Sequence, residues 1–75
     1  MTTYGQKAVG LDFNPSANPD VDRVKTKFAE IIDLCHELMA QANGPEHEAL
    51  FIEAIRESMT AQMWCVKALT WRYAP

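Results

Sequence analysis

The chain has 75 residues, of which 48% are hydrophobic, and its formal net charge is −3. This length allows a single small domain over residues 1–75, and the hydrophobic content excludes a disordered tail. The acidic balance argues against DNA or RNA as a partner, whereas a small anionic ligand needs positive charge only where it binds.

Residues 1–18 are predicted to form an irregular arm. They hold two of the three glycines and most of the turn-forming residues, which disfavour regular structure. The segment also carries four spaced apolar residues, which are Tyr4, Val9, Leu11 and Phe13. We expect these side chains to hold the arm against the helices.

A first long helix is predicted over residues 19–42. Asn18 suits the N-cap and Pro19 the first helical position, and acidic residues in the first turn complement the helix dipole. Apolar residues then recur in alternating steps of three and four, which is a heptad seam. The seam consists of Val21, Val24, Phe28, Ile31, Cys35, Leu38 and Ala42. Ile32 and Met39 add a second stripe, which predicts contacts with more than one neighbour.

A second long helix is predicted over residues 45–73. Gly44 suits the left-handed position after a helix and Pro45 the first turn of another, and so short a connection makes the two helices antiparallel neighbours. The seam of the second helix consists of Ile52, Ile55, Met59, Gln62, Val66, Leu69 and Tyr73.

The end of the second helix, AQMWCVKALTW, is apolar on all sides. Such a helix must be buried on all sides, and one other long helix cannot cover it. The sequence therefore predicts an all-α antiparallel two-helix hairpin with an irregular N-terminal arm, assembled into a compact homo-oligomer.

The same segment is shorter than the roughly 20 residues that cross a bilayer, and Lys67 interrupts it. The N-terminal residues lack the apolar region of a secretory signal. Cys35 and Cys65 lie among apolar residues and are expected to be reduced core thiols. These features predict a cytoplasmic protein without a membrane partner.

Metal binding is not predicted. Asp33-x-x-His36 resembles half of the carboxylate–histidine motif of di-iron bundles, which requires a matching motif on a facing helix. The second helix offers Glu53-x-x-Arg56, and an arginine cannot ligate a metal. His47 lies between two glutamates at the start of that helix and is expected at the surface.

No catalytic group is predicted either, so the protein is not expected to be an enzyme. His36 adjoins Cys35 but projects about 100° away around the helix. Ser58 and Thr60 lie in the middle of a helix without a plausible base, and no glycine-rich loop matches a phosphate cradle.

Three basic residues mark a candidate anion site near the start of the first helix. They are Arg23, Lys25 and Lys27. The helix dipole and free backbone N–H groups there favour negative charge. The alternative is a solvated basic face that balances Asp20 and Asp22.

Tyr4 and Phe13 are candidates for stacking on a base, and packing of the arm is the alternative for both. Lys67 lies in an otherwise apolar helix, so its ammonium needs a route to water or an anion. If subunits meet there around an axis, several copies of Lys67 converge and require a polyanion.

Two segments and the turn between them resemble the phage anti-CBASS cyclic-nucleotide sponges, which share a helical-hairpin domain with the phage anti-Thoeris sponges. The segments are GLDFNPSANPDVDRVKTKFAEIIDL and TAQMWCVKALTW. The resemblance extends from about Tyr4 to Trp71. Its most specific parts are the D-R-V-K start of the first helix and the AQMWCVKALTW end of the second.

The resemblance implies a compact hexamer in the host bacterial cytoplasm that sequesters cyclic oligonucleotides made by bacterial defence enzymes, without cleaving them. It also implies that cyclic dinucleotides bind between two subunits, where Lys25 contacts a phosphate and Phe13 or Tyr4 covers a base. Cyclic trinucleotides would bind separately on three-fold axes, where Lys67 and Lys27 face the phosphates. Some relatives have arginine at the position of Lys67.

The alternative hypothesis is a small helical oligomerisation or adaptor protein that binds another protein. It explains the apolar second helix equally well, but it gives Lys67 no role.

Overall fold

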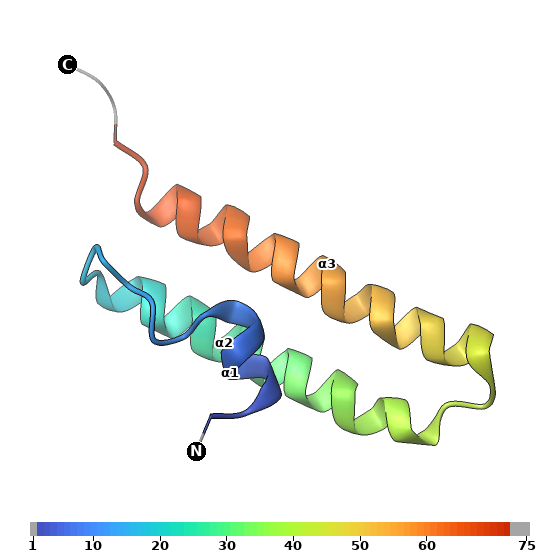
Figure 1. Ribbon diagram of the computed structural model, residues 1–75. Helices are drawn as coiled ribbons and strands as arrows, with labels where there is room; N and C mark the ends of the chain where they lie inside the picture. Colours follow the sequence, from blue (N-terminus) through green and yellow to red (C-terminus); the bar gives the residue numbers. More distant parts are fainter. Residues whose placement is uncertain (1, 73–75) are drawn as a thin grey trace.

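The structure is a computed structural model that describes residues 2–72. Its elements are α1 (Tyr4–Val9), α2 (Pro19–Leu38), a 3-10 turn η1 (Met39–Gln41) and α3 (Pro45–Leu69). The long helices α2 and α3 lie side by side and antiparallel, and α1 crosses α2 (Figure 1). The described residues contain no strand. The predicted all-α hairpin is therefore confirmed.

The helix α1 corrects the prediction of an irregular arm. Thr3 Oγ1 accepts a hydrogen bond from the backbone N–H of Gln6 at 3.1 Å, and Gln6 Oε1 accepts one from the N–H of Thr3 at 3.0 Å. This reciprocal capping box starts a helix in spite of the glycines nearby. Gly10 ends the helix with φ +63°, a conformation that glycine adopts without strain.

Gly5 brings α1 close to α2. A Cβ atom at this position would lie 2.2 Å from the carbonyl oxygen of Ala29, so a larger residue would separate the helices. The N–H of Gly5 donates to Asp33 Oδ1 at 2.6 Å. The arm is thus held against α2, and of its four apolar residues Val9 and Leu11 pack at the core.

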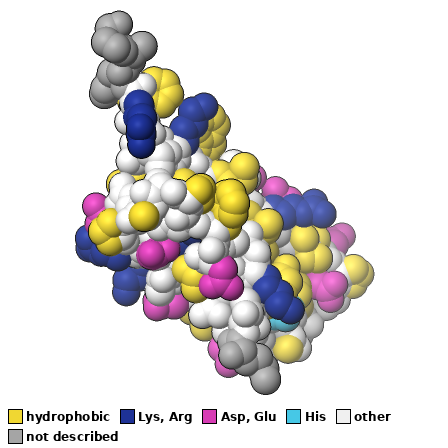
Figure 2. All heavy atoms as spheres, turned by 60° about the vertical axis from the view of Figure 1, so that its left-hand side comes forward, with side chains coloured by type: hydrophobic (Ala, Val, Ile, Leu, Met, Phe, Trp, Pro, Cys, Tyr) yellow, Lys and Arg dark blue, Asp and Glu magenta, His cyan; other side chains and the backbone are white. Residues whose placement is uncertain are grey.

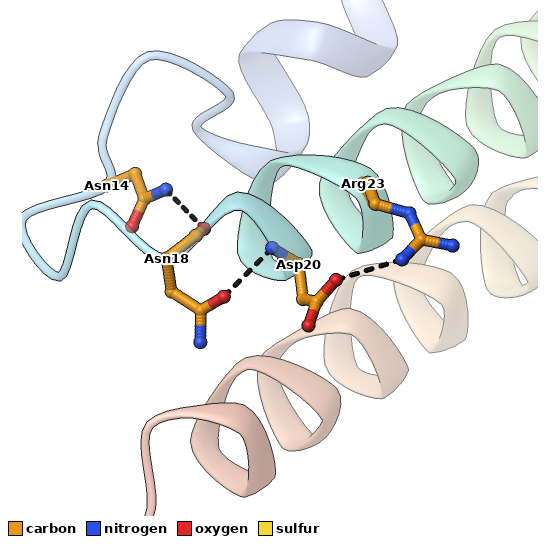
Figure 3. Close-up of polar contacts among 4 residues, drawn as sticks. All are labelled: Asn14, Asn18, Asp20 and Arg23. Carbon is orange, nitrogen blue, oxygen red and sulfur yellow. Dashed lines mark hydrogen bonds and ion pairs between the residues drawn. The ribbon is translucent and has the colours of Figure 1, made fainter.

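The helix α2 begins at the predicted cap. Asn18 Oδ1 accepts a hydrogen bond from the N–H of Asp20 at 2.8 Å, and Pro19 is the first helical residue (Figure 3). The α-helix ends at Leu38 and tightens into η1. The predicted range of 19–42 includes both elements.

The helix α3 begins at Pro45 and ends at Leu69. The predicted range of 45–73 is longer, and its last residue, Tyr73, lies outside the described residues. Gly44 has the expected positive φ, +99°, but its ψ of 174° is not the left-handed helical value that ends a helix. It is instead the residue from which α3 starts.

The core is small and lies where α1 crosses the hairpin. Its buried apolar side chains are Val9, Ala29, Ile32 and Ile55. The buried residues of α2 are Val21, Lys25, Ala29 and Ile32. The heptad seam predicted for this helix is therefore wrong in part, since Ile31 and Leu38 remain 49% and 37% exposed. The reason is that α1 packs on the side of α2 that carries Ala29.

The molecule is thin and elongated. Its extents are 53 × 28 × 13 Å. The radius of gyration is 14.2 Å, against about 11 Å for a compact domain of this length. The accessible area is 5744 Å², against about 4,700 Å² for a compact monomer of this mass.

Most of α3 is uncovered as a result. Only Ile55 and Gln62 are buried among its residues, and Met59, Val66 and Leu69 of the predicted seam are half-buried. The large apolar residues of α3 that remain exposed are Leu50, Ile52, Met63 and Trp64. One hairpin therefore leaves much of this helix uncovered. This agrees with the sequence analysis, which predicted that one other long helix could not cover it.

Candidate functional site

Basic residues gather where α2 begins and α3 ends. We call this region, residues 12–28 and 62–72, the open end; Figure 2 turns it toward the viewer. It holds five of the seven lysines and arginines but three of the ten aspartates and glutamates. Its formal charge is +2 and that of the remaining chain −5, which together give the net −3. The acidic chain thus has one end that favours anions.

The backbone N–H groups at the start of α2 are engaged within the chain. Asn18 accepts from Asp20 through its side chain, at 2.8 Å, and from Val21 through its carbonyl, at 3.1 Å. Pro19 has no N–H. Asn14 Nδ2 donates a hydrogen bond to the Asn18 carbonyl oxygen at 2.9 Å (Figure 3). The expectation that free N–H groups attract an anion here is therefore wrong, and what remains is the helix dipole.

Arg23 and Lys27 have acidic neighbours one turn away. Arg23 Nη1 lies 2.9 Å from Asp20 Oδ1, as Figure 3 shows, and Lys27 Nζ lies 3.9 Å from Glu30 Oε2. All four side chains are exposed, and such pairs contribute about 0–1 kcal/mol each. For these two residues the geometry agrees with a solvated face whose charges are partly balanced.

Arg23 and Lys27 also border an open hollow of about 610 Å³ between α2 and α3, beside Phe28, Cys65 and Leu69. Lys67 lines a different hollow. Within one protomer the two lysines assigned to the trinucleotide site therefore border separate spaces.

Lys25 is the basic residue that the fold buries, with 6% of its surface exposed. Its Nζ donates to the carbonyl oxygen of Gly10 at 2.9 Å and to that of Phe13. Among the described residues its charge has no carboxylate partner within ion-pair distance. An ammonium has three N–H donors, so the two carbonyls leave one donor and a full positive charge for a further partner.

The two aromatic candidates of the arm have different surroundings. The ring of Phe13 is 71% exposed, and its centroid lies 5.8 Å from Lys25 Nζ. The ring of Tyr4 is stacked on the imidazole of His36, with centroids 4.2 Å apart and an interplanar angle of 11°. The structure therefore places Phe13, and not Tyr4, beside Lys25.

Lys67 is exposed near the end of α3, and its Nζ lies 5.7 Å from the centroid of the Trp64 ring. Together with Ala68 and Trp71 these residues line a hollow of about 450 Å³. The sequence analysis did not treat the two tryptophans as site residues. The position of Trp64, three residues before Lys67 on one helix, was the signal that could have identified it.

The remaining candidates have structural partners. Asp33 accepts from Gly5 and His36 stacks on Tyr4, while His47 Nδ1 accepts from the N–H of Asn43 at 2.9 Å. No group of three or more potential metal ligands occurs within the described residues. Nor does any helix in residues 2–72 combine the length and hydrophobicity needed to cross a membrane.

Both cysteines are free thiols. Cys35 is half-buried, in line with a place near the core, but Cys65 is exposed on α3. The prediction that Cys65 is a core thiol is therefore wrong for the single hairpin, because α2 covers only one side of α3.

Comparisons of the chain with family models, curated proteins and solved structures find no match.

Proposed function

We propose that the protein is a sponge for cyclic di- and trinucleotide messengers. It binds them in the host bacterial cytoplasm without cleaving them and so blocks the antiphage signalling of CBASS. The observation that carries the proposal is the buried ammonium of Lys25, which has no carboxylate partner among the described residues and lies beside the exposed ring of Phe13.

A buried charge without an opposite charge is costly, and a phosphate would relieve this cost at Lys25. Hydrogen bonds between an ammonium and a phosphate are charge-assisted and stronger than neutral ones. The neighbouring Phe13 ring offers an apolar face on which a base can stack. The proximity of this ammonium and this ring supports the proposal that one phosphate and one base bind side by side, the role that the resemblance implies for Lys25.

The exposed apolar surface supports assembly of several copies, and the resemblance makes this assembly a hexamer. The accessible area, 5744 Å², exceeds that of a compact monomer by about 1,000 Å². A stable interface buries about 800 Å² on each partner. The exposed apolar residues of α2 are Ile31, Leu34 and Leu38, and they continue the heptad spacing that a second helix requires.

The same surface would suit a different protein partner, which is the adaptor hypothesis. The excess of positive charge at the open end favours the sponge, because the adaptor hypothesis gives this charge no role. Light scattering coupled to gel filtration separates the possibilities for the surface. A stable, well-folded monomer near 8.5 kDa would contradict self-assembly.

The function is tested by a thermal-shift panel with cyclic dinucleotides, cyclic trinucleotides and their linear counterparts. A ligand at 100 times its dissociation constant should stabilise the fold by about 2.7 kcal/mol. The linear counterparts, which lack the symmetry of the ring, should stabilise it less. Mass spectrometry of the released ligand should find an intact ring, and the absence of a shift with every cyclic nucleotide would contradict the proposal.

A further inference from the structure

Two exposed tryptophans lie beside Lys67 near the end of α3. Trp64 and Trp71 are 65% and 55% exposed, and they are the two tryptophans of the chain. Side chains three and four residues apart lie on the same side of a helix. Trp64 and Lys67, three residues apart on α3, therefore project to the same side. Trp71 lies two residues beyond the end of α3 and lines the same hollow, together with Ala68.

The cluster combines flat apolar rings with a positive charge. Lys67 Nζ lies 5.7 Å from the Trp64 centroid, within the range of a cation–π contact. Neither of the ion pairs found among the described residues involves Lys67. The cluster thus offers ring faces for stacking and an ammonium that is available to an anion.

We propose that Trp64 and Trp71 stack on the bases of a cyclic trinucleotide whose phosphates lie against Lys67. This inference rests on the proposed function and adds base contacts to a site so far assigned only to phosphates. Aromatic residues contribute to nucleotide affinity by stacking on bases of any identity. The site should therefore require bases but discriminate weakly among them.

The charge of the cluster argues for a nucleotide and against a second copy of the helix. Packing an apolar helix on this face would bury the Lys67 ammonium without an opposite charge, which is costly. A nucleotide ring brings its own negative charges to the same place, and the surrounding open end carries a formal charge of +2 against −5 for the remaining chain.

The experiment is a titration of the full chain, followed by tryptophan emission and by calorimetry. The probes are cyclic triadenylate and trimetaphosphate, an inorganic ring with three phosphates and no base. Because both tryptophans lie in the cluster, emission reports on this face alone. Cyclic triadenylate should change the emission to saturation, and trimetaphosphate should not compete with it at equal concentration.

Three variants test the stacking contact while the charge of Lys67 is kept. Trp64→Leu removes the flat ring and should weaken binding of cyclic triadenylate at least about tenfold, whereas Trp64→Phe should stay within about threefold because it keeps a ring. Leu50→Ala is the matched control, since Leu50 is 70% exposed on the same helix far from the cluster. It should leave the affinity unchanged.

The outcomes distinguish this inference from the proposed function. Binding of cyclic triadenylate with unchanged emission and full affinity in Trp64→Leu would overturn the stacking contacts and leave the sponge in place. Competition by trimetaphosphate at equal concentration would do the same. Failure of every cyclic nucleotide to bind the wild type would overturn the function itself. If Trp64→Leu does not assemble, the wild-type titration with the two probes decides the matter.

Discussion

Replacement of Lys25 by methionine should reduce the affinity for a cyclic dinucleotide by about 10- to 150-fold. Methionine keeps an unbranched apolar side chain but has no ammonium, so the phosphate loses a charged hydrogen bond worth about 1.5–3 kcal/mol. The fold should survive, because Gly10 is half-exposed and Phe13 exposed, and their carbonyl groups can turn to water.

The assay is calorimetric titration of wild type and Lys25→Met with one cyclic dinucleotide. Lys27→Met is the matched control, since Lys27 belongs to the same turns of α2 but is exposed beside Glu30. It should change the affinity less than about threefold. Equal affinity of wild type and Lys25→Met, or an equal loss in both variants, would refute the role assigned to the buried ammonium.

A double-mutant cycle of Lys25→Met and Phe13→Ala measures whether Lys25 and Phe13 contribute independently to the binding free energy. Phe13→Ala should cost about 1–3 kcal/mol of binding if the ring stacks on a base. Because Lys25 also holds the carbonyl of Phe13, the two losses should sum to more than the loss in the double variant. Strict additivity would show that Lys25 contacts the ligand without placing the ring.

Two further predictions concern the fold. Gly5→Ala should destabilise the protein by at least about 1 kcal/mol in urea unfolding, because its Cβ would lie 2.2 Å from the Ala29 carbonyl oxygen. The control is Gly10→Asn, at a left-handed position with open space around it, which should lose less stability. An equal loss in both variants would contradict the close contact of α1 with α2. Gln62→Met should stabilise the protein by about 1–3 kcal/mol, since Gln62 Oε1 is buried without a hydrogen-bond partner. A loss of stability in the same measurement would contradict this prediction and indicate that the oxygen has a partner in the assembled protein.

The long helices could be predicted because their signals are local. Asn18-Pro19 caps α2 within two residues, and Gly44-Pro45 starts α3 in the same way. The helix α1 also has a local signal, the pair Thr3 and Gln6, but the prediction gave more weight to the glycines. At Gly5 this was misleading, because the missing side chain serves close packing and not a turn.

The candidate site was less predictable because it depends on contacts between distant residues. Lys25 is hydrogen-bonded to the carbonyl groups of Phe13 and Gly10, which are 12 and 15 residues away. No spacing rule relates a lysine to such partners. The same holds for the stacking of Tyr4 on His36, which gives one of the two aromatic candidates a partner within the chain. Trp64 shares α3 with Lys67, so its position followed from sequence alone, whereas Trp71 lies beyond the end of α3 and its place in the same hollow required the structure.

The thin shape of the molecule has a consequence for how the proposed sponge would work in an infected cell. A molecule with a shortest extent of 13 Å has little interior, so in the proposed assembly much of its stability would come from contacts between copies. Stability then depends on protomer concentration through mass action. We expect dilute protomers to be short-lived and ligand capacity to rise steeply once synthesis passes the concentration of assembly. Early and abundant expression would then matter as much as affinity for the messenger.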